Sequence, residues 1–121
     1  MNFFKRRKIL KKSNYLEVTP VRKCDFSSND EGIVTLIVPK FKNEKFNKWF
    51  LNHRKRFFRI ALDEAGSVVW LQIDGQRKVY EICNKATEIL GEKIQPVDQR
   101  VTKFLTTLYD SRFISFREIE E

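Results

Sequence analysis

The chain has 121 residues, of which 41% are hydrophobic and 13% aromatic, and its formal net charge is +8. A chain of this length and apolar content can form one domain whose core needs no disulfide or metal. It contains no run of about 18 apolar residues that could span a membrane, and its N-terminus lacks the apolar core and cleavage site of a secretory signal, so we expect a cytoplasmic protein.

Residues 1–14 form a basic segment ahead of a domain that we predict at residues 15–121. The cations of this segment are Lys5, Arg6, Arg7, Lys8, Lys11 and Lys12, and it contains no acidic residue. Positive charge of this density attracts polyanions or acidic peptides.

Two strands are predicted next, at residues 16–26 and 33–38. The residues between them, 27–32, are turn formers, so the two strands are expected to pair as an antiparallel hairpin. Pro20 cannot donate a ladder hydrogen bond, which predicts an edge or a bulge at that point of the first strand. Pro39 ends the second strand.

A basic insert occupies residues 41–56. Phe46, Trp49, Phe50 and His53 recur in it at helical spacing among many lysines and arginines, which predicts a short basic helix or an ordered loop. The following residues, 57–62, have the aromatic and β-branched content of a third strand.

The first of three amphipathic helices follows this strand. Its apolar face ends at Ile73 and is widened by Trp70 and Leu71. Asp74-Gly75 then ends the helix, because glycine adopts the left-handed conformation of a helix C-terminus at little steric cost.

Two further helices and a strand complete the predicted fold. One helix covers residues 79–90 and is closed by Gly91, and the other follows Pro96 and covers residues 97–108. Residues 113–116 alternate like a short strand. The predicted class is α+β, a winged helix-turn-helix with an N-terminal three-stranded antiparallel sheet, three helices and a short C-terminal strand.

The residue types required for a catalytic or metal site do not occur in a suitable arrangement. His53 is the only histidine, and neither Cys nor carboxylate pairs stand around it at zinc-ligand spacing. Cys24 and Cys83 have no recognisable activating partner and are expected to be reduced thiols. The sequence also has no glycine-rich phosphate loop, so we predict no enzyme activity, no cofactor and no metal.

An ordered series of short motifs resembles the PqqD-like family, which comprises small winged-helix domains that also serve as peptide-recognition elements in enzymes modifying ribosomally made peptides. The matching residues are Leu62-Asp63, Gly66-Ser67, Val69-Trp70, Asp74-Gly75, Val79, Glu81-Ile82, Gly91-Glu92, Pro96, Arg100, Phe104, Leu108 and Phe113-Ile114. The resemblance covers residues 15–116. It marks the domain and not its cargo, so no link to pyrroloquinoline quinone in particular follows.

The chain departs from the family pattern at two places. Lys78 stands where the family usually has Thr, which together with Glu81 would form a capping box. Because a lysine cannot accept backbone N–H bonds, we expect the helix start to lose about 1 kcal/mol unless Asp74 or water substitutes. The insert at residues 41–56 is longer than the hairpin of the shortest members.

The resemblance implies a mechanism in which the free edge of the sheet accepts an extended leader peptide as an added strand, against a groove formed by the third helix. In this chain the edge would be residues 57–62. The candidate peptide-binding residues are Phe57, Arg59, Ala61, Arg100, Lys103, Phe104 and Thr107. The implied partners are a precursor peptide and a modifying enzyme, with a radical S-adenosylmethionine enzyme as one candidate.

Simpler interpretations stand beside these assignments. Phe104 shares a helical stripe with Val101 and Leu108, which favours a core position, and packing is the favoured role of Trp70 and Trp49. Arg100 and Lys103 fit an ordinary solvated face.

Other functions also stay open. Nucleic-acid binding is the main alternative, because winged helices place their third helix in the major groove and this chain is basic. A further possibility is an interaction module whose basic residues 46–56 dock a partner. The chain could be a monomer, or a homodimer formed through an exposed strand edge.

Overall fold

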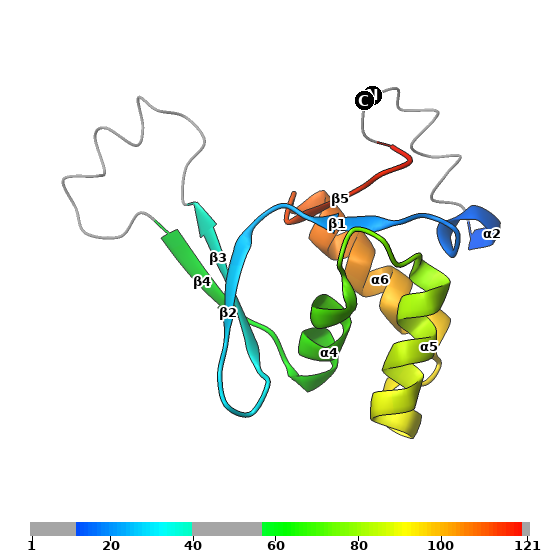
Figure 1. The fold of residues 1–121 in the computed structure, drawn as a ribbon, viewed down its shortest axis with the longest axis horizontal. Coiled ribbons are helices and arrows are strands. Elements are labelled where there is room, and N and C mark those ends of the chain that lie inside the picture. The colour runs from blue at the N-terminus through cyan, green and yellow to red at the C-terminus, as the bar shows by residue number, and fades with distance from the viewer. Residues whose placement is uncertain (1–11, 40–56, 120–121) are drawn as a thin grey trace.

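The computed structural model describes residues 12–39 and 57–119 (Figure 1). In chain order the elements are α2 (Lys12–Tyr15), β1 (Pro20–Arg22), β2 (Asp25–Ser28), β3 (Val34–Pro39), β4 (Phe57–Ala61), α4 (Glu64–Gln72), α5 (Val79–Leu90), the 3₁₀ helix η1 (Gly91–Ile94), α6 (Val97–Asp110) and β5 (Ile114–Phe116). The α+β class, the three-stranded antiparallel sheet, the three helices and the C-terminal strand confirm the prediction. The winged helix-turn-helix assignment stays a prediction, and the expected element at residues 41–56 lies outside the described residues.

The single strand predicted at residues 16–26 is wrong. The chain forms two short strands there, and they belong to different sheets: β1 pairs with β5, whereas β2 pairs with β3 in a sheet of order β2-β3-β4. Backbone bonds from Lys23 N to Phe113 O (2.8 Å) and from Arg117 N to Thr19 O (2.9 Å) extend the pairing of β1 with the C-terminal segment. Pro20 lies at the first residue of β1, where a strand tolerates the missing N–H donor. The β1–β5 pair crosses α6, and the three-stranded sheet lies beside α4 (Figure 1).

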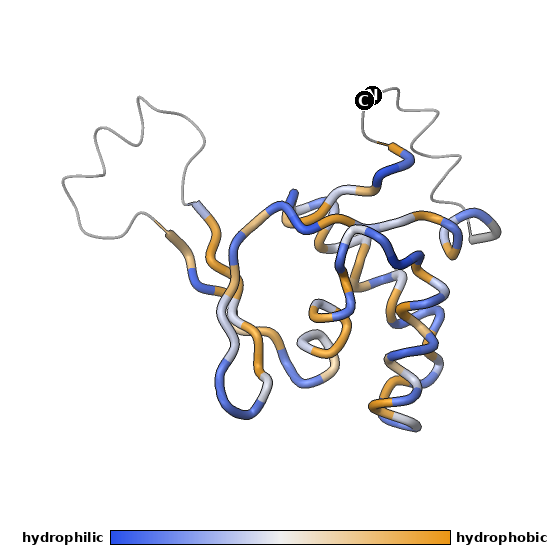
Figure 2. Tube along the Cα trace, in the orientation of Figure 1, coloured by the Kyte–Doolittle hydropathy of each residue, from blue (hydrophilic) through white to orange (hydrophobic). Residues whose placement is uncertain are grey.

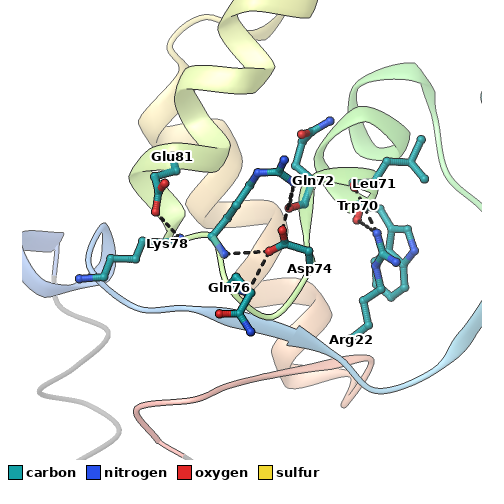
Figure 3. Close-up of polar contacts among 9 residues, drawn as sticks. Arg22, Trp70, Leu71, Gln72, Asp74, Gln76, Lys78 and Glu81 are labelled. Carbon is teal, nitrogen blue, oxygen red and sulfur yellow. Dashed lines mark hydrogen bonds and ion pairs between the residues drawn. The ribbon is translucent and has the colours of Figure 1, made fainter.

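The turn at Asp74-Gly75 ends α4 as predicted. The Asp74 Oδ1 atom accepts hydrogen bonds from the backbone N–H groups of Gln76 (2.9 Å) and Arg77 (2.8 Å), as Figure 3 shows. Gly75 has a φ of 78°, a conformation that costs glycine little. These backbone hydrogen bonds lower the pKa of Asp74 below its usual value. Asp74 therefore orders its own turn and does not cap α5.

The start of α5 is satisfied from elsewhere in the chain. The N–H of Val79 donates to Val18 O (2.9 Å), and the N–H of Tyr80 donates to Leu16 O (3.0 Å). Glu81 supplies its half of a capping box, since its Oε1 accepts from the N–H of Lys78 at 3.1 Å (Figure 3). The expected loss from Lys78 is therefore offset by two backbone carbonyls of the segment before β1, which sequence reasoning had assigned to a strand.

The core lies between the helices and the inner faces of the two sheets. Its largest fully buried side chains are Trp70, Phe116, Leu36, Ile73, Ile82, Leu105 and Ile114. Trp70 packs edge-on against Phe26 of β2 with 5.8 Å between ring centroids, which confirms its packing role. Leu71 is 38% exposed, so the prediction that it widens the buried face of α4 is wrong. Residue 71 lies just beyond the edge of the buried stripe that residues 66, 69, 70 and 73 form.

Arg22 joins the crossover between the two sheets to the end of α4. Its Nη2 donates to the carbonyl oxygens of Trp70 (2.9 Å) and Leu71 (3.2 Å), as Figure 3 shows. Its guanidinium also lies 4.6 Å from the ring centroid of Phe26. A cation at this position complements the negative end of the helix dipole. Burial lowers the pKa of Arg22, which the nearby Asp74 carboxylate partly counteracts.

Candidate functional site

Strand β4 lies at one edge of the three-stranded sheet within the described part of the chain. Its pairing with β3 places Ile60 opposite Leu36 and Phe58 opposite Val38. The N–H of Leu62 donates to Val34 O (2.8 Å), and this bond determines which residues of β4 form hydrogen bonds with β3. Because antiparallel hydrogen bonding alternates along a strand, the backbone groups of residues 58 and 60 point toward β3, and those of residues 57, 59 and 61 point outward.

The three candidate residues on the strand are therefore the three whose backbone groups face away from β3. Phe57, Arg59 and Ala61 each present one N–H and one C=O along this edge, over the full length of β4. An extended peptide can bond to such a row without any change in the sheet. We call this row the β4 edge.

The side chains of β4 separate into two faces. Ile60 and Phe58 share the face of the fully buried Leu36, yet they are 36% and 50% exposed. Phe57, Arg59 and Ala61 lie on the opposite face. Figure 2 shows a hydrophilic position in β4 with hydrophobic positions on both sides. Over the described residues, this face of the sheet is thus buried at Leu36 of β3 and partly exposed at β4.

The sheet and α4 are tied together where β4 ends. The hydroxyl of Ser67, which is buried, accepts a hydrogen bond from the N–H of Val34 at 2.9 Å. Asp63 caps α4, because its Oδ1 accepts from the N–H of Gly66 at 2.7 Å. The end of β4 is therefore fixed relative to the first turn of α4.

A hollow of about 90 Å³ lies next to this junction, between α4, η1 and α6. Its lining residues are Asp63, Ala65, Gly66, Val69, Ile94, Arg100, Val101 and Phe104. Apolar side chains form most of the wall, and Asp63 and Arg100 supply one charge of each sign. We call it the α4–α6 hollow.

Phe104 lies close to the first turn of α4, at Gly66. A Cβ atom added at Gly66 would lie 3.2 Å from Phe104 Cζ and 3.0 Å from Asp63 Oδ1. Phe104 is partly buried and packs against the core, in agreement with the core interpretation, and it also lines the hollow. The Nη1 of Arg100 donates to Lys93 O of η1, which holds the guanidinium beside the same hollow.

The other two candidates on α6 lie in a different hollow. Lys103 and Thr107 line a space of about 470 Å³ between α2 and α6, together with Tyr15 and Leu16. The structure thus brings Arg100 and Phe104 beside Asp63 and the first turn of α4, while Lys103 and Thr107 occupy the neighbouring stripe of the helix. Spacing in the sequence places 100 with 104 and 103 with 107, but it does not indicate which pair faces the sheet.

Tyr15 is the residue of this larger hollow that sequence reasoning missed. Its hydroxyl donates to Thr102 O (3.1 Å) and is 2.7 Å from Thr106 Oγ1. Burial raises the pKa of Tyr15 to about 12. No local sequence signal reports these contacts, because they join residues about ninety positions apart in the chain.

The described residues hold no activated nucleophile and no metal-binding group. Both cysteines are free, and burial raises the pKa of Cys83 to about 12 and that of Cys24 above its usual value. Residues 12–39 and 57–119 contain no cluster of three or more His, Cys, Asp or Glu side chains that could hold a metal ion. Within the same ranges, none of the helices has the length and apolar character required to cross a membrane.

Comparison with protein families gives a match over more than half of the chain. The profile of the family described as "Coenzyme PQQ synthesis protein D (PqqD)" matches residues 50–114, which include β4, the three main helices and the start of β5. Searches of curated proteins and of solved structures gave no match. Members of this family are non-catalytic accessory proteins that are associated with a precursor peptide and modifying enzymes. The chain belongs to the PqqD family.

Proposed function

We propose that this protein is a cytoplasmic, non-catalytic peptide chaperone. It binds the leader of a ribosomally made precursor peptide by strand addition and presents the peptide to a modifying enzyme, for which a radical S-adenosylmethionine enzyme is one candidate. The observation that carries this proposal is the β4 edge, a row of outward backbone groups over Phe57–Ala61 in a chain of the PqqD family. In strand addition the main-chain bonds supply affinity, while side-chain pockets supply specificity.

The α4–α6 hollow supports this assignment. Its wall includes Asp63, two residues beyond the end of β4, and it is mostly apolar and contains Arg100 and Phe104. The net charge of +8 favours an acidic peptide over a basic one.

The charge of α6 favours peptide binding over nucleic-acid binding. The helix carries two basic residues, Arg100 and Lys103, and two acidic residues, Asp98 and Asp110, so it has no net charge. Arg100 already donates to Lys93 O. A helix that reads the major groove needs base-reading side chains and neutralises phosphates, and α6 is poorly equipped for either task.

The variant Ala61→Pro tests the proposal. The N–H of Ala61 points away from β3, so its removal leaves the internal ladder intact, and edge strands tolerate proline at such positions. Ala61→Val is the matched control, because it keeps the N–H at the same position. Wild type and both variants would be used as bait in source-cell lysate, at low and at high salt, and the bound short peptides would be identified and resynthesised.

We expect wild type and Ala61→Val to retain the same encoded peptide at high salt, and Ala61→Pro to lose it while keeping a native circular dichroism spectrum. Equal affinity of the resynthesised peptide for Ala61→Pro and wild type would contradict binding at this edge. Recovery of nucleic acid alone, with elution that depends steeply on salt, would instead support the nucleic-acid function.

A further inference from the structure

The side chains of β4 specify the kind of strand that can pair with it. We infer that the guest segment carries an acidic residue between two apolar residues, with the Asp or Glu opposite Arg59 and the apolar residues opposite Phe58 and Ile60. This inference rests on the proposed function and adds the class of peptide sequence that the β4 edge selects.

The apolar half of the pattern follows from the rows that cross the sheet. One row contains Phe26, Leu36 and Ile60, and exposure rises along it from the fully buried Leu36 to Ile60 at the edge. Val38 and Phe58 form the neighbouring row, and its outer side chain, Phe58, is 50% exposed. The next position in each row would belong to the guest strand, about 4.8 Å beyond β4.

Pairing geometry brings these guest side chains close to Phe58 and Ile60. The backbone groups of residues 58 and 60 point toward β3, so in an antiparallel guest the residues opposite them form non-hydrogen-bonded pairs, in which the Cα atoms are only about 4.5 Å apart. Aromatic and β-branched residues gain most from contacts of this kind. Polar guest side chains opposite Phe58 and Ile60 would lose their hydrogen bonds to water without gaining a hydrogen-bonding partner.

The acidic position follows from Arg59. Its side chain lies on the opposite face, where its cross-strand neighbour is Ile37 and the next residue in the row is Asp25. Asp25 is two strands away, about 10 Å. Arg59 forms no hydrogen bond or ion pair with any residue that the structure describes. The guest residue opposite Arg59 is therefore the position where a carboxylate can pair with it.

The pattern does not depend on the direction of the guest. Side chains alternate between faces with a period of two in parallel and antiparallel strands alike, so the residue between two apolar neighbours always reaches the face of Arg59. Phe57 and Ala61 flank Arg59 on that face. Since β4 has five residues, the selected window is about five residues long.

Selection from an mRNA-displayed library of random ten-residue segments tests this inference on the full chain. The baits are wild type, Arg59→Glu and Lys85→Glu. Lys85 is exposed on α5, which lies on the opposite side of the molecule from β4 (Figure 1), so its reversal makes the same change in net charge without altering the β4 edge. Enriched segments would be resynthesised and measured against each bait and against Ala61→Pro.

We expect wild type and Lys85→Glu to enrich apolar–acidic–apolar segments and Arg59→Glu to enrich apolar–basic–apolar segments. A synthetic peptide with Glu at the centre should bind wild type at least about fivefold more tightly than the same peptide with Lys, and Arg59→Glu should reverse this order. If Arg59→Glu selects the same segments as wild type, the inference is wrong.

Two further outcomes separate this inference from the proposed function. Enriched segments that lack the pattern but lose affinity for Ala61→Pro would overturn the inference and leave strand addition standing. Failure of every bait to enrich any segment would count against peptide binding at the β4 edge, and the inference would fall with it.

Discussion

Replacement of Gly66 by alanine measures how tightly Phe104 of α6 packs against the first turn of α4. In an ordinary helix this change stabilises the protein by roughly 0.5–1 kcal/mol, because glycine loses more backbone entropy on folding. Here the new Cβ atom would lie 3.2 Å from Phe104 Cζ and 3.0 Å from Asp63 Oδ1, which itself accepts the Gly66 N–H. Both neighbours must move.

The expected sign is therefore reversed. Overpacking of a filled site costs about 1–3 kcal/mol, and a weakened N-cap adds up to about 1 kcal/mol, against the small gain in propensity. We expect Gly66→Ala to lower the free energy of unfolding by roughly 1–2 kcal/mol. The variant Phe104→Leu removes the tip of the ring and should relieve the part of this cost that comes from the ring in the double variant.

Urea unfolding of wild type, both single variants and the double variant gives a double-mutant cycle. We expect a coupling free energy of at least about 1 kcal/mol between positions 66 and 104. An unchanged slope against urea is the control that all four proteins unfold in the same way. A Gly66→Ala variant as stable as wild type, or a coupling near zero, would refute the close packing of Phe104 on α4.

Three other substitutions test the contacts outside the β4 edge. Arg22→Met should lower the free energy of unfolding by roughly 2 kcal/mol, because the carbonyls of Trp70 and Leu71 lose a charged hydrogen-bond donor. A loss under about 0.5 kcal/mol in urea unfolding would contradict the stabilising role of Arg22. The pKa of Tyr15 is raised from 10.0 to about 12 in the folded protein. The un-ionised phenol therefore contributes stability that is complete below pH 10 and is lost as the pH rises toward 12, by roughly 3 kcal/mol in total. Tyr15→Phe should abolish this alkaline loss of stability when unfolding is measured over a pH series. Backbone hydrogen bonds lower the pKa of Asp74, so the stability that its carboxylate contributes is present above the unfolded-state pKa near 4 and disappears as the pH falls through the folded-state pKa. Asp74→Asn should therefore make the free energy of unfolding less sensitive to acid. An unchanged acid profile would count against the Asp74 turn.

Much of the architecture could be predicted because it depends on local patterns. The helical period after residue 62, the glycine at position 75 and the turn formers before residue 33 act through neighbouring residues, and the elements they predict are present. The candidate edge could be located for the same reason, since residues 57–62 have the composition of a strand and β4 occupies 57–61.

The sequence by itself therefore determined the α+β class and, from residue 57 onward, the order of a strand, three helices and a short strand. Only the tertiary structure decided which segments pair. Residues 16–28 divide between two sheets because β5 and β3 offer separate ladders, and the carbonyls of Leu16 and Val18 satisfy α5 in place of a side-chain cap. The tertiary structure also decided that Phe104 and Arg100, and not Lys103, lie beside Asp63 at the start of α4. Such contacts join residues far apart in the chain, and they depend on how whole elements pack against one another. The local hydrophobic periodicity of the sequence does not specify that packing.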